Sequence, residues 1–182
     1  ARGNVHVTGY FTNTVDFDPG AGTANLTSIG EYDIFIAKYD ASGNYIWAKS
    51  VGSTSFDIGQ GIALDAGGNV HVTGYFRNTA DFDPGAGTAN LSSMGDGDIF
   101  VAKYDALGNY LWANSMGDSE SDAGYSIALS ATGNVHITGF FQGTVDFDPG
   151  AGTANLTSAG GGDVFIAQYN ASGIYQWAKQ VG

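Results

Sequence analysis

The sequence predicts an all-β protein made of tandem four-stranded antiparallel sheets, arranged as the blades of a β-propeller whose ring is incomplete. The first supporting observation is a 65-residue repeat, since the string GNVHVTGYF at Gly3 returns at Gly68 and again, as GNVHITGFF, at Gly133. The second is that each unit contains short apolar stretches separated by turn residues, without helical periodicity. The repeat divides the chain into a partial blade without its first strand at 1–52, a blade at 53–117 and a blade at 118–182.

Four strands and two tight turns are expected in the central unit. The strands lie at 61–65, 69–76, 98–105 and 109–115, and each has an ordinary length. The turns lie at 65–69 and 105–109, where Gly and Asn accept the positive φ that tight hairpins require. Propeller repeats usually have about 40 to 50 residues. We therefore expect the excess, 78–96, to form an elongated hairpin or loop between the second and third strands.

The third predicted strand should be covered on both faces. One alternating set, Ile99 and Val101, is apolar, and so is the other, Phe100, Ala102 and Tyr104. Each sheet is therefore expected to pack against a neighbour on either side, as blades do. Propellers close with roughly four to eight blades, and this chain holds fewer than three full units. Its ends should expose apolar faces, so an isolated monomer is the least expected state.

Composition argues against several classes of function. The 182 residues include 6 basic and 18 acidic ones, which gives a formal charge of −12. Such a charge repels the phosphates of nucleic acids and acidic lipids. The absence of Cys excludes disulfides, thiol catalysis and zinc–thiolate sites. No apolar run reaches the roughly 18 to 20 residues needed to cross a bilayer, so we expect neither nucleic acid as a partner nor membrane insertion.

A single active site would be expected to use polar residues that differ between the copies. These residues form no visible set of nucleophile, base and orienting group; they are Arg2, Arg77, Glu31, Glu120, Gln142 and Gln168. His6, His71 and His136 occupy one strand position in every copy and are expected to be structural or surface residues, although three histidines on a ring axis could bind a metal. The sequence thus predicts a protein that is not an enzyme, and catalysis would require a site outside these residues.

The segment SFDIGQG, which starts at Ser55, is similar to the Asp-box turn of sialidase-like propellers. Asp57 and Gly59 are in place, but Gly61 and Ile62 stand where that motif has Thr and Trp. The chain also has only two arginines, whereas sialidases need an arginine cluster. We therefore expect Asp57 and its counterpart Asp122 to accept backbone N–H bonds ahead of an inner strand.

An Asp-Phe-Asp-Pro-Gly motif in the inserted segment is the main candidate for a ligand site. In an extended segment its two carboxylates fall on one face, about 7 Å apart, and hard oxygen ligands of this kind suit Ca²⁺. The alternative is that each Asp caps a turn or faces solvent while the intervening Phe17, Phe82 or Phe147 packs into the blade. The six candidate calcium ligands are Asp16, Asp18, Asp81, Asp83, Asp146 and Asp148.

Four glycosylation sequons are present, and three of them lie in the inserted segments. They begin at Asn25, Asn90, Asn155 and Asn170. Because so short a pattern often arises by chance, both surface glycosylation and an ordinary turn stay open.

The strings GIALDAGGNVHVTGYF and DIFVAKYDALGNYLW, with the linker SMGDSESDAGYSIAL, resemble the SBBP β-propeller repeat of bacterial secreted and cell-surface proteins. The resemblance covers the whole chain, although the inserted segment lengthens the unit. It implies four antiparallel strands per blade in a large extracellular or cell-surface bacterial protein, commonly one without an assigned activity.

Together these features predict a non-enzymatic scaffold that presents identical loops for multivalent contact. The expected partners are other copies of the chain or further blades of a longer chain, with glycans or cell-surface proteins as further candidates. The alternative is a calcium-dependent lectin or adhesin, which is suggested by the repeated Asp pairs and the negative charge.

Overall fold

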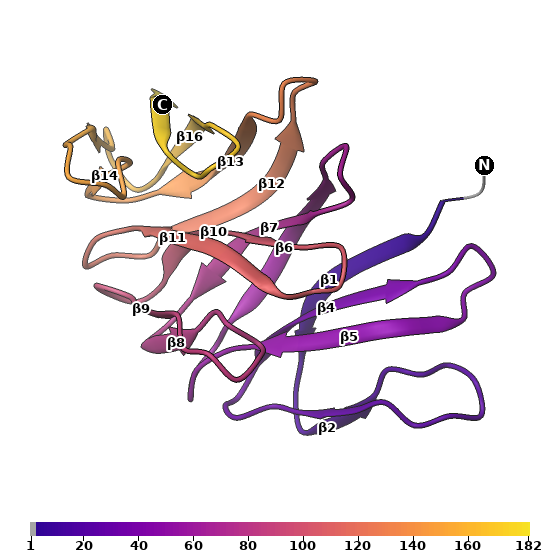
Figure 1. Ribbon diagram of the computed structural model, residues 1–182. Helices are drawn as coiled ribbons and strands as arrows, with labels where there is room; N and C mark the ends of the chain where they lie inside the picture. The colour runs from indigo at the N-terminus through magenta and orange to yellow at the C-terminus, as the bar shows by residue number, and fades with distance from the viewer. Residues whose placement is uncertain (1–2) are drawn as a thin grey trace.

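The computed structural model describes residues 3–182 and shows three antiparallel sheets in a row (Figure 1). No helix occurs among the described residues, so none of them forms a helix that is long and apolar enough to cross a membrane. The prediction of an all-β chain built from repeated propeller blades is confirmed. In sheet order, the strands are β1 (Val5–Phe11), β4 (Asp33–Tyr39) and β5 (Tyr45–Val51); β6 (Ile58–Leu64), β7 (Val70–Phe76), β10 (Asp98–Tyr104) and β11 (Tyr110–Met116); and β12 (Ala123–Leu129), β13 (Val135–Phe141), β16 (Asp163–Tyr169) and β17 (Tyr175–Val181).

The sheets share an inner and an outer side. β6 contacts both β1 and β12, so the first strands of the second and third sheets line one side of the row. β5, β11 and β17 form the opposite edges of the three sheets. Within the described residues the first sheet has no equivalent of β6, and β1 pairs only with β4.

Each inserted segment forms a two-stranded hairpin beside the outermost strand of its own sheet. In the central copy, the hydroxyls of Thr79 and Ser92 lie 2.7 Å apart, and the Phe82 N–H donates to the Ala89 carbonyl at 3.1 Å. A hairpin is one of the two forms expected for 78–96. The three hairpins consist of β2 (Thr14–Asp16) with β3 (Asn25–Thr27), β8 (Thr79–Asp81) with β9 (Asn90–Ser92), and β14 (Thr144–Asp146) with β15 (Asn155–Thr157).

The two tight turns of the central sheet form as predicted. Gly68 and Gly108 both have a φ of +80°, which favours glycine, and their N–H groups donate to the carbonyls of Asp65 and Asp105 at 2.9 and 3.0 Å. These turns join β6 to β7 and β10 to β11.

β6 begins at Ile58, three residues before the predicted strand at 61–65. Its pairing with β7 shifts register between Gly59 and Gly61, which marks a β-bulge opposite Gly74. The prediction missed this start because glycines are weak strand formers. In the structure, Gly59 of β6 is paired with Gly74 of β7, and the absence of side chains there lets the backbones of the two strands approach closely.

The hydrophobic core lies in the seams between the sheets. In β10, Phe100, Ala102 and Tyr104 pack in the seam with the first sheet, whereas Ile99 and Val101 pack in the seam with the third. The prediction that both faces of this strand are covered is therefore confirmed. The buried partners include Ile34, Ile36 and Val51 of the first sheet and Val135, Ile137, Phe165 and Tyr169 of the third, together with Val70, Val72 and Met116 of the central sheet itself.

Candidate interaction surfaces

The aspartates of the Asp-Phe-Asp-Pro-Gly motifs organise the hairpin loops. In the central copy, Asp81 Oδ1 accepts the N–H groups of Asp83 at 3.0 Å and Ala89 at 2.8 Å, and Asp83 Oδ1 accepts the Gly85 N–H at 2.8 Å. The same bonds recur in the other two copies, where Asp16, Asp18, Asp146 and Asp148 are the acceptors. The arrangement is that of Asx turns, in which carboxylates satisfy the backbone of a tight loop.

These loop hydrogen bonds also favour the charged form of the first carboxylate. The N–H groups of Ala24 and Asp18 lower the pKa of Asp16 below its ordinary value. Across residues 3–182, no three His, Cys, Asp or Glu side chains gather closely enough to hold a metal ion. The calcium site expected at the six aspartates therefore stays a prediction.

The phenylalanine between the two aspartates anchors each hairpin in the hydrophobic core beside its own sheet. Phe82 is fully buried, with its ring centroid 5.3 Å from Phe76 and 5.1 Å from Phe100. The buried Tyr104 hydroxyl donates to the Phe82 carbonyl at 3.2 Å. Phe147 is equally buried, and Phe17 is nearly so. Each loop is therefore fixed to its sheet at the outer side of the row.

The three histidines pack within separate sheets and do not gather in one site. His71 is fully buried, and its ring lies edge-on to Trp112 with centroids 6.0 Å apart. Burial, followed by the nearby Lys103, lowers its pKa to about 4. His6 packs edge-on to Trp47, and His136 packs against Trp177 in a tilted arrangement, both with centroids 6.3 Å apart. These are structural positions.

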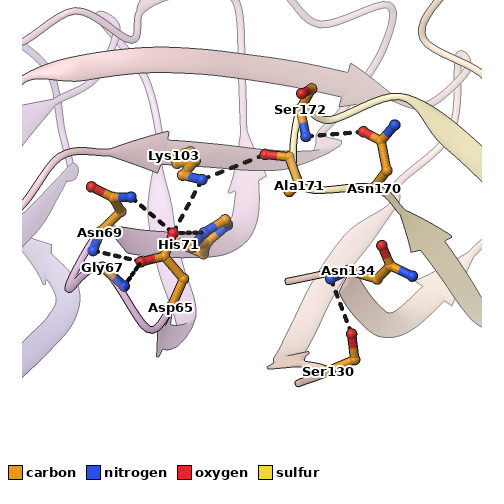
Figure 2. Close-up of polar contacts among 10 residues, drawn as sticks. All are labelled: Asp65, Gly67, Asn69, His71, Lys103, Ser130, Asn134, Asn170, Ala171 and Ser172. Carbon is orange, nitrogen blue, oxygen red and sulfur yellow. Dashed lines mark hydrogen bonds and ion pairs between the residues drawn. The ribbon is translucent and has the colours of Figure 1, made fainter. Parts of the chain in front are cut away.

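A copy-specific ion pair lies beside His71 in the central sheet (Figure 2). Lys103 Nζ is 3.1 Å from Asp65 Oδ2, and His71 Nε2 is 3.6 Å from the same oxygen. Lys103 also donates to the Ala171 carbonyl of the third sheet at 3.4 Å. The ion pair therefore links a turn of one sheet to a turn of the next.

Different side chains occupy the corresponding positions of the third sheet. Ser130 replaces the aspartate, and its hydroxyl accepts the Asn134 N–H at 3.0 Å (Figure 2). Gln168 replaces the lysine, and its Oε1 accepts the Trp177 indole N–H at 3.0 Å and lies 2.9 Å from His136 Nε2. Gln168 thus makes its hydrogen bonds within its own sheet, whereas Lys103 also donates to a carbonyl of the neighbouring sheet.

Asp57 and Asp122 accept backbone N–H groups directly before the inner strands β6 and β12, as expected. Asp122 Oδ2 accepts from Asp118 at 3.0 Å, and its Oδ1 accepts from Gln142 at 2.9 Å. Asp57 makes the equivalent bonds to the N–H groups of Ser53 and Arg77. Both carboxyls are fully buried, and burial raises the pKa of Asp122 to about 6.

The remaining copy-specific residues contact neighbouring loops or are exposed. The Arg77 guanidinium lies 5.6 Å from the centroid of the Phe56 ring, which is a cation–π distance. Gln142 Oε1 accepts the Ser121 N–H at 3.4 Å. Glu31 and Glu120 are exposed, and Arg2 lies outside the described residues.

The sequons occupy exposed hairpin strands and one turn. Asn25, Asn90 and Asn155 begin the strands β3, β9 and β15 and are exposed. Asn170 Oδ1 instead accepts the N–H groups of Ser172 and Ile174, which closes the turn before β17. Three sequons are therefore accessible on the inserted hairpins, whereas Asn170 has a local structural role.

A tryptophan of each preceding sheet packs over a turn glycine of the next. A Cβ placed on Gly108 would lie 3.2 Å from the Trp47 ring, and one placed on Gly173 would lie 3.0 Å from the Trp112 ring. The Trp47 indole N–H and Lys38 Nζ both donate to the Ala106 carbonyl, at 3.2 and 3.0 Å. The strand placement of these tryptophans in the sequence favours packing between blades, and the structure confirms it, with the Trp and the Gly recurring in every unit.

The third sheet exposes the side chains that the internal seams bury. Val164, Ile166 and Val181 are 48%, 40% and 61% exposed. Their counterparts in the second sheet, Ile99, Val101 and Met116, are at most 2% exposed because the third sheet covers them. The face of the third sheet that points away from the second sheet therefore repeats a seam surface but is not covered. We call it the trailing face (Val164, Ile166, Trp177 and Val181).

The first sheet exposes the opposite surface of a seam. Val5 and Val7 are 50% and 38% exposed, whereas the equivalent Val70 and Val72 are fully buried. A pocket of about 390 Å³ opens beside them, and no atom lies within 4 Å of a Cβ placed on Gly43, the counterpart of Gly108. We call this surface the leading face; its pocket is lined by Val5, Asp16, Phe17, Pro19, Tyr39 and Gly43.

Comparison with known proteins agrees with the repeated architecture. No family model matches the chain. An uncharacterized WD repeat-containing protein of Acanthamoeba polyphaga mimivirus is 28% identical over 158 residues, which cover 72% of this chain and 11% of that protein. The regulatory protein FlaEY of Caulobacter vibrioides is 27% identical over 144 residues, which cover 79% of this chain and 15% of FlaEY. The chain therefore spans less than one sixth of either relative, and the similarity to a WD repeat protein agrees with a row of propeller blades.

Proposed function

We propose that this chain is a non-enzymatic repeat scaffold that works as an arc of a larger propeller. The arc is completed either by other copies of the chain or by further blades of a longer chain. The observation that carries this proposal is the exposure of Val164 and Ile166 at one end and of Val5 and Val7 at the other, at positions that the internal seams bury. Exposed apolar faces of this kind are typical of interaction sites.

The scaffold would act by presenting equivalent hairpin loops at regular intervals. The three Asp-Phe-Asp-Pro-Gly loops share the same hydrogen bonds and the same anchoring phenylalanine. Repeated presentation raises avidity for a partner that carries matching epitopes, such as a glycan or a cell-surface protein. The resemblance to SBBP repeats supports an extracellular or cell-surface location in bacteria, and the relative named for its WD repeats supports a repeat module.

The mass of the protein from its natural source tests this proposal. We expect a native mass well above the 18.8 kDa of this chain. A denatured mass that is also larger would show further blades in one polypeptide, and a denatured mass equal to that of this chain would show assembly. A native mass equal to 18.8 kDa would contradict the scaffold proposal.

A calcium-dependent lectin or adhesin is the second candidate. This candidate is favoured by a carboxylate pair that recurs in three copies. In the central copy the loop hydrogen bonds end on Oδ1 of Asp81 and of Asp83, so these bonds do not use Oδ2 of either carboxylate. On this candidate, calorimetric titration of the intact protein with calcium should show binding, and Asp81→Asn should remove about one third of the sites. Asp105→Asn, in a turn of β10–β11, is the matched control and should leave calcium binding unchanged. If the unmodified protein releases or absorbs no heat, the calcium candidate fails.

A further inference from the structure

A pocket of about 350 Å³ lies between the central and third sheets, near the start of the inner strands β6 and β12. These strands contact each other, and β12 also contacts β7, so both walls belong to one internal seam (Figure 1). We propose that this pocket binds a sugar acid, with the carboxylate paired to Arg77 and the sugar ring packed on aromatic side chains. The inference goes beyond the scaffold function, because it assigns a small-molecule ligand to a site whose key residues differ between the copies. The lining includes Gln60, Tyr75, Arg77, Ser121, Tyr125 and Phe140.

Two small residues distinguish this place from its counterpart in the first seam. There, the ring centroids of Tyr10 and Tyr32 lie 4.6 Å apart, and those of Tyr32 and Phe56 lie 5.1 Å apart. One unit further along the chain, Gly97 replaces Tyr32 and Ser121 replaces Phe56. The same parallel bridge joins the two positions in both seams. The second seam therefore keeps the backbone of this place but lacks two of the three aromatic rings that pack there in the first.

Arg77 brings a positive charge to the pocket, and that charge has no partner of its own. Its guanidinium lies 5.6 Å from the centroid of the Phe56 ring, and its Nε is buried without a hydrogen-bond partner. Asp57 accepts only the main-chain N–H of Arg77, at 3.0 Å. Both ion pairs found within residues 3–182 end on Asp65, so none of the described carboxylates pairs with Arg77. A guanidinium in this state can bind a ligand carboxylate through two parallel N–H···O bonds.

The other walls of the pocket suit a sugar ring. Tyr125 and Phe140 have ring centroids 5.6 Å apart with their planes inclined by 31°, and Tyr125 is 52% exposed. Aromatic faces of this kind pack on apolar groups, while a tyrosine hydroxyl remains able to form hydrogen bonds. Gln60 and Ser121 add further donors and acceptors.

A sugar acid combines the groups that these walls require. Its ring has C–H groups on its faces and hydroxyls around its edge, and it carries one carboxylate. The side chain of a peptide Asp or Glu would supply the carboxylate alone and leave the polar wall without partners. The volume of about 350 Å³ lies near the lower end of the range for small-molecule sites, so it suits a single sugar unit.

The other copies supply variants that the fold tolerates at the key position. Thr12 and Gln142 stand where the central unit has Arg77. Gln142 Oε1 accepts the Ser121 N–H at 3.4 Å, so an uncharged amide is compatible with the local backbone. Arg77→Gln therefore removes the charge with little disturbance of the sheet.

NMR titration of the isotope-labelled chain tests the proposed ligand. The chain contains two arginines, so the Nε–H signal that Arg77→Gln removes is that of Arg77. D-glucuronate should shift this signal in a saturable way. D-glucose, which has the same ring but no carboxylate, should leave it in place.

Three variants separate the pocket from general effects of charge. Arg77→Gln should weaken glucuronate binding, followed through the Ser121 amide signal, by roughly tenfold or more. Ser121→Phe, which restores the side chain found at Phe56, should fill the pocket and abolish the shift of the Arg77 signal. Lys103→Gln is the matched control, because it removes one positive charge near the far end of the same two sheets and Gln168 is its natural counterpart. This variant should bind glucuronate as the unmodified chain does, and circular dichroism should show that all three fold.

Several results would overturn the assignment. They are the absence of any shift with glucuronate, an equal shift with glucose, and unchanged glucuronate affinity in Arg77→Gln. Tighter binding of N-acetylaspartate amide than of glucuronate would assign the pocket to an acidic peptide and overturn the sugar ligand. The native mass, which tests the scaffold function, is independent of all these outcomes.

Discussion

Gly74→Ala is expected to destabilise the chain by about 3 kcal/mol or more, because overpacking against a rigid backbone is costly. A Cβ on Gly74 would overlap the Ile58 carbonyl oxygen of β6 and approach the Phe100 ring to 2.9 Å. The carbonyl belongs to Ile58, which pairs with Tyr75 of β7 directly before the bulge at Gly59 to Gly61, so it cannot move without disturbing the strand pairing. Urea unfolding monitored by tryptophan fluorescence measures the change in the free energy of unfolding.

Gly9→Ala is the matched control for this prediction. Gly9 is the counterpart of Gly74 in the first sheet, where no strand equivalent to β6 is present among the described residues. The three atoms nearest to a Cβ at Gly9 all belong to the Phe35 ring, the first at 2.8 Å, and a side chain can turn away. We expect a loss of about 1 kcal/mol or less. Equal losses for the two variants would show that the bulge is not the cause.

The free energy of unfolding is expected to fall as the pH rises from about 5 to 7.5. Burial raises the pKa of both Asp98 and Asp122 to about 6, and nearby Asp118 adds to the effect. The pKa of an unfolded aspartate is about 3.9. The native state therefore binds these protons more tightly, so the stabilisation is complete below about pH 4 and is lost as the pH rises through about 6. A shift of two units corresponds to at most about 3 kcal/mol for each group, and the two contributions overlap because Asp98 is among the causes of the Asp122 shift.

Other aspartates limit this gain at low pH. The pKa of Asp16 is lowered by the N–H groups of Ala24 and Asp18, and that of Asp40 is lowered by hydrogen bonds from Asn44. Their contribution is present above the unfolded pKa and is lost as the pH falls further. We therefore expect maximal stability near pH 4 to 5.

Chemical unfolding at several pH values measures this dependence, and Asp98→Asn identifies its origin. An amide at position 98 can still accept the Met94 N–H, which Asp98 Oδ2 accepts at 3.1 Å, but it cannot ionise. This variant should lose part of the pH dependence between pH 5 and 7.5, and Asp122 and the other buried carboxyls, Asp33 and Asp57, should keep the rest. Asp105→Asn, in the turn before β11, should keep all of it. A stability that is constant over this range in the unmodified chain would contradict the prediction.

Alternating patterns in the sequence predicted the main features of the fold. Ile99 and Val101 on one face of β10, and Phe100 on the other, were enough to place a neighbour on both sides, because strand side chains alternate with a period of two. The turns at Gly68 and Gly108 followed from residues that tolerate positive φ. In each case the cause of the structure lies within a few residues of the chain.

Features that depend on distant parts of the chain could not be predicted in this way. Trp47 and Lys38 contact Ala106 of another sheet, and no local pattern records such a pairing. The start of β6 was missed because the register shift near Gly59 depends on β7. The Asp81 motif was compatible with both a turn and a metal ligand, and only the hydrogen bonds show how its carboxylate builds the loop.

The equivalent seams also have an evolutionary consequence. Of the 49 residues from 4 to 52, 38 are identical to their counterparts in 69–117, and both internal seams place a tryptophan over a turn glycine. Duplication or deletion of one complete 65-residue unit in the gene would therefore recreate a seam of the same kind, whereas duplication of only part of a unit would leave strands without their partners. Changes in the number of units would be limited chiefly by the closure of the ring, so the number of blades can change one at a time while the apolar packing of each seam is preserved.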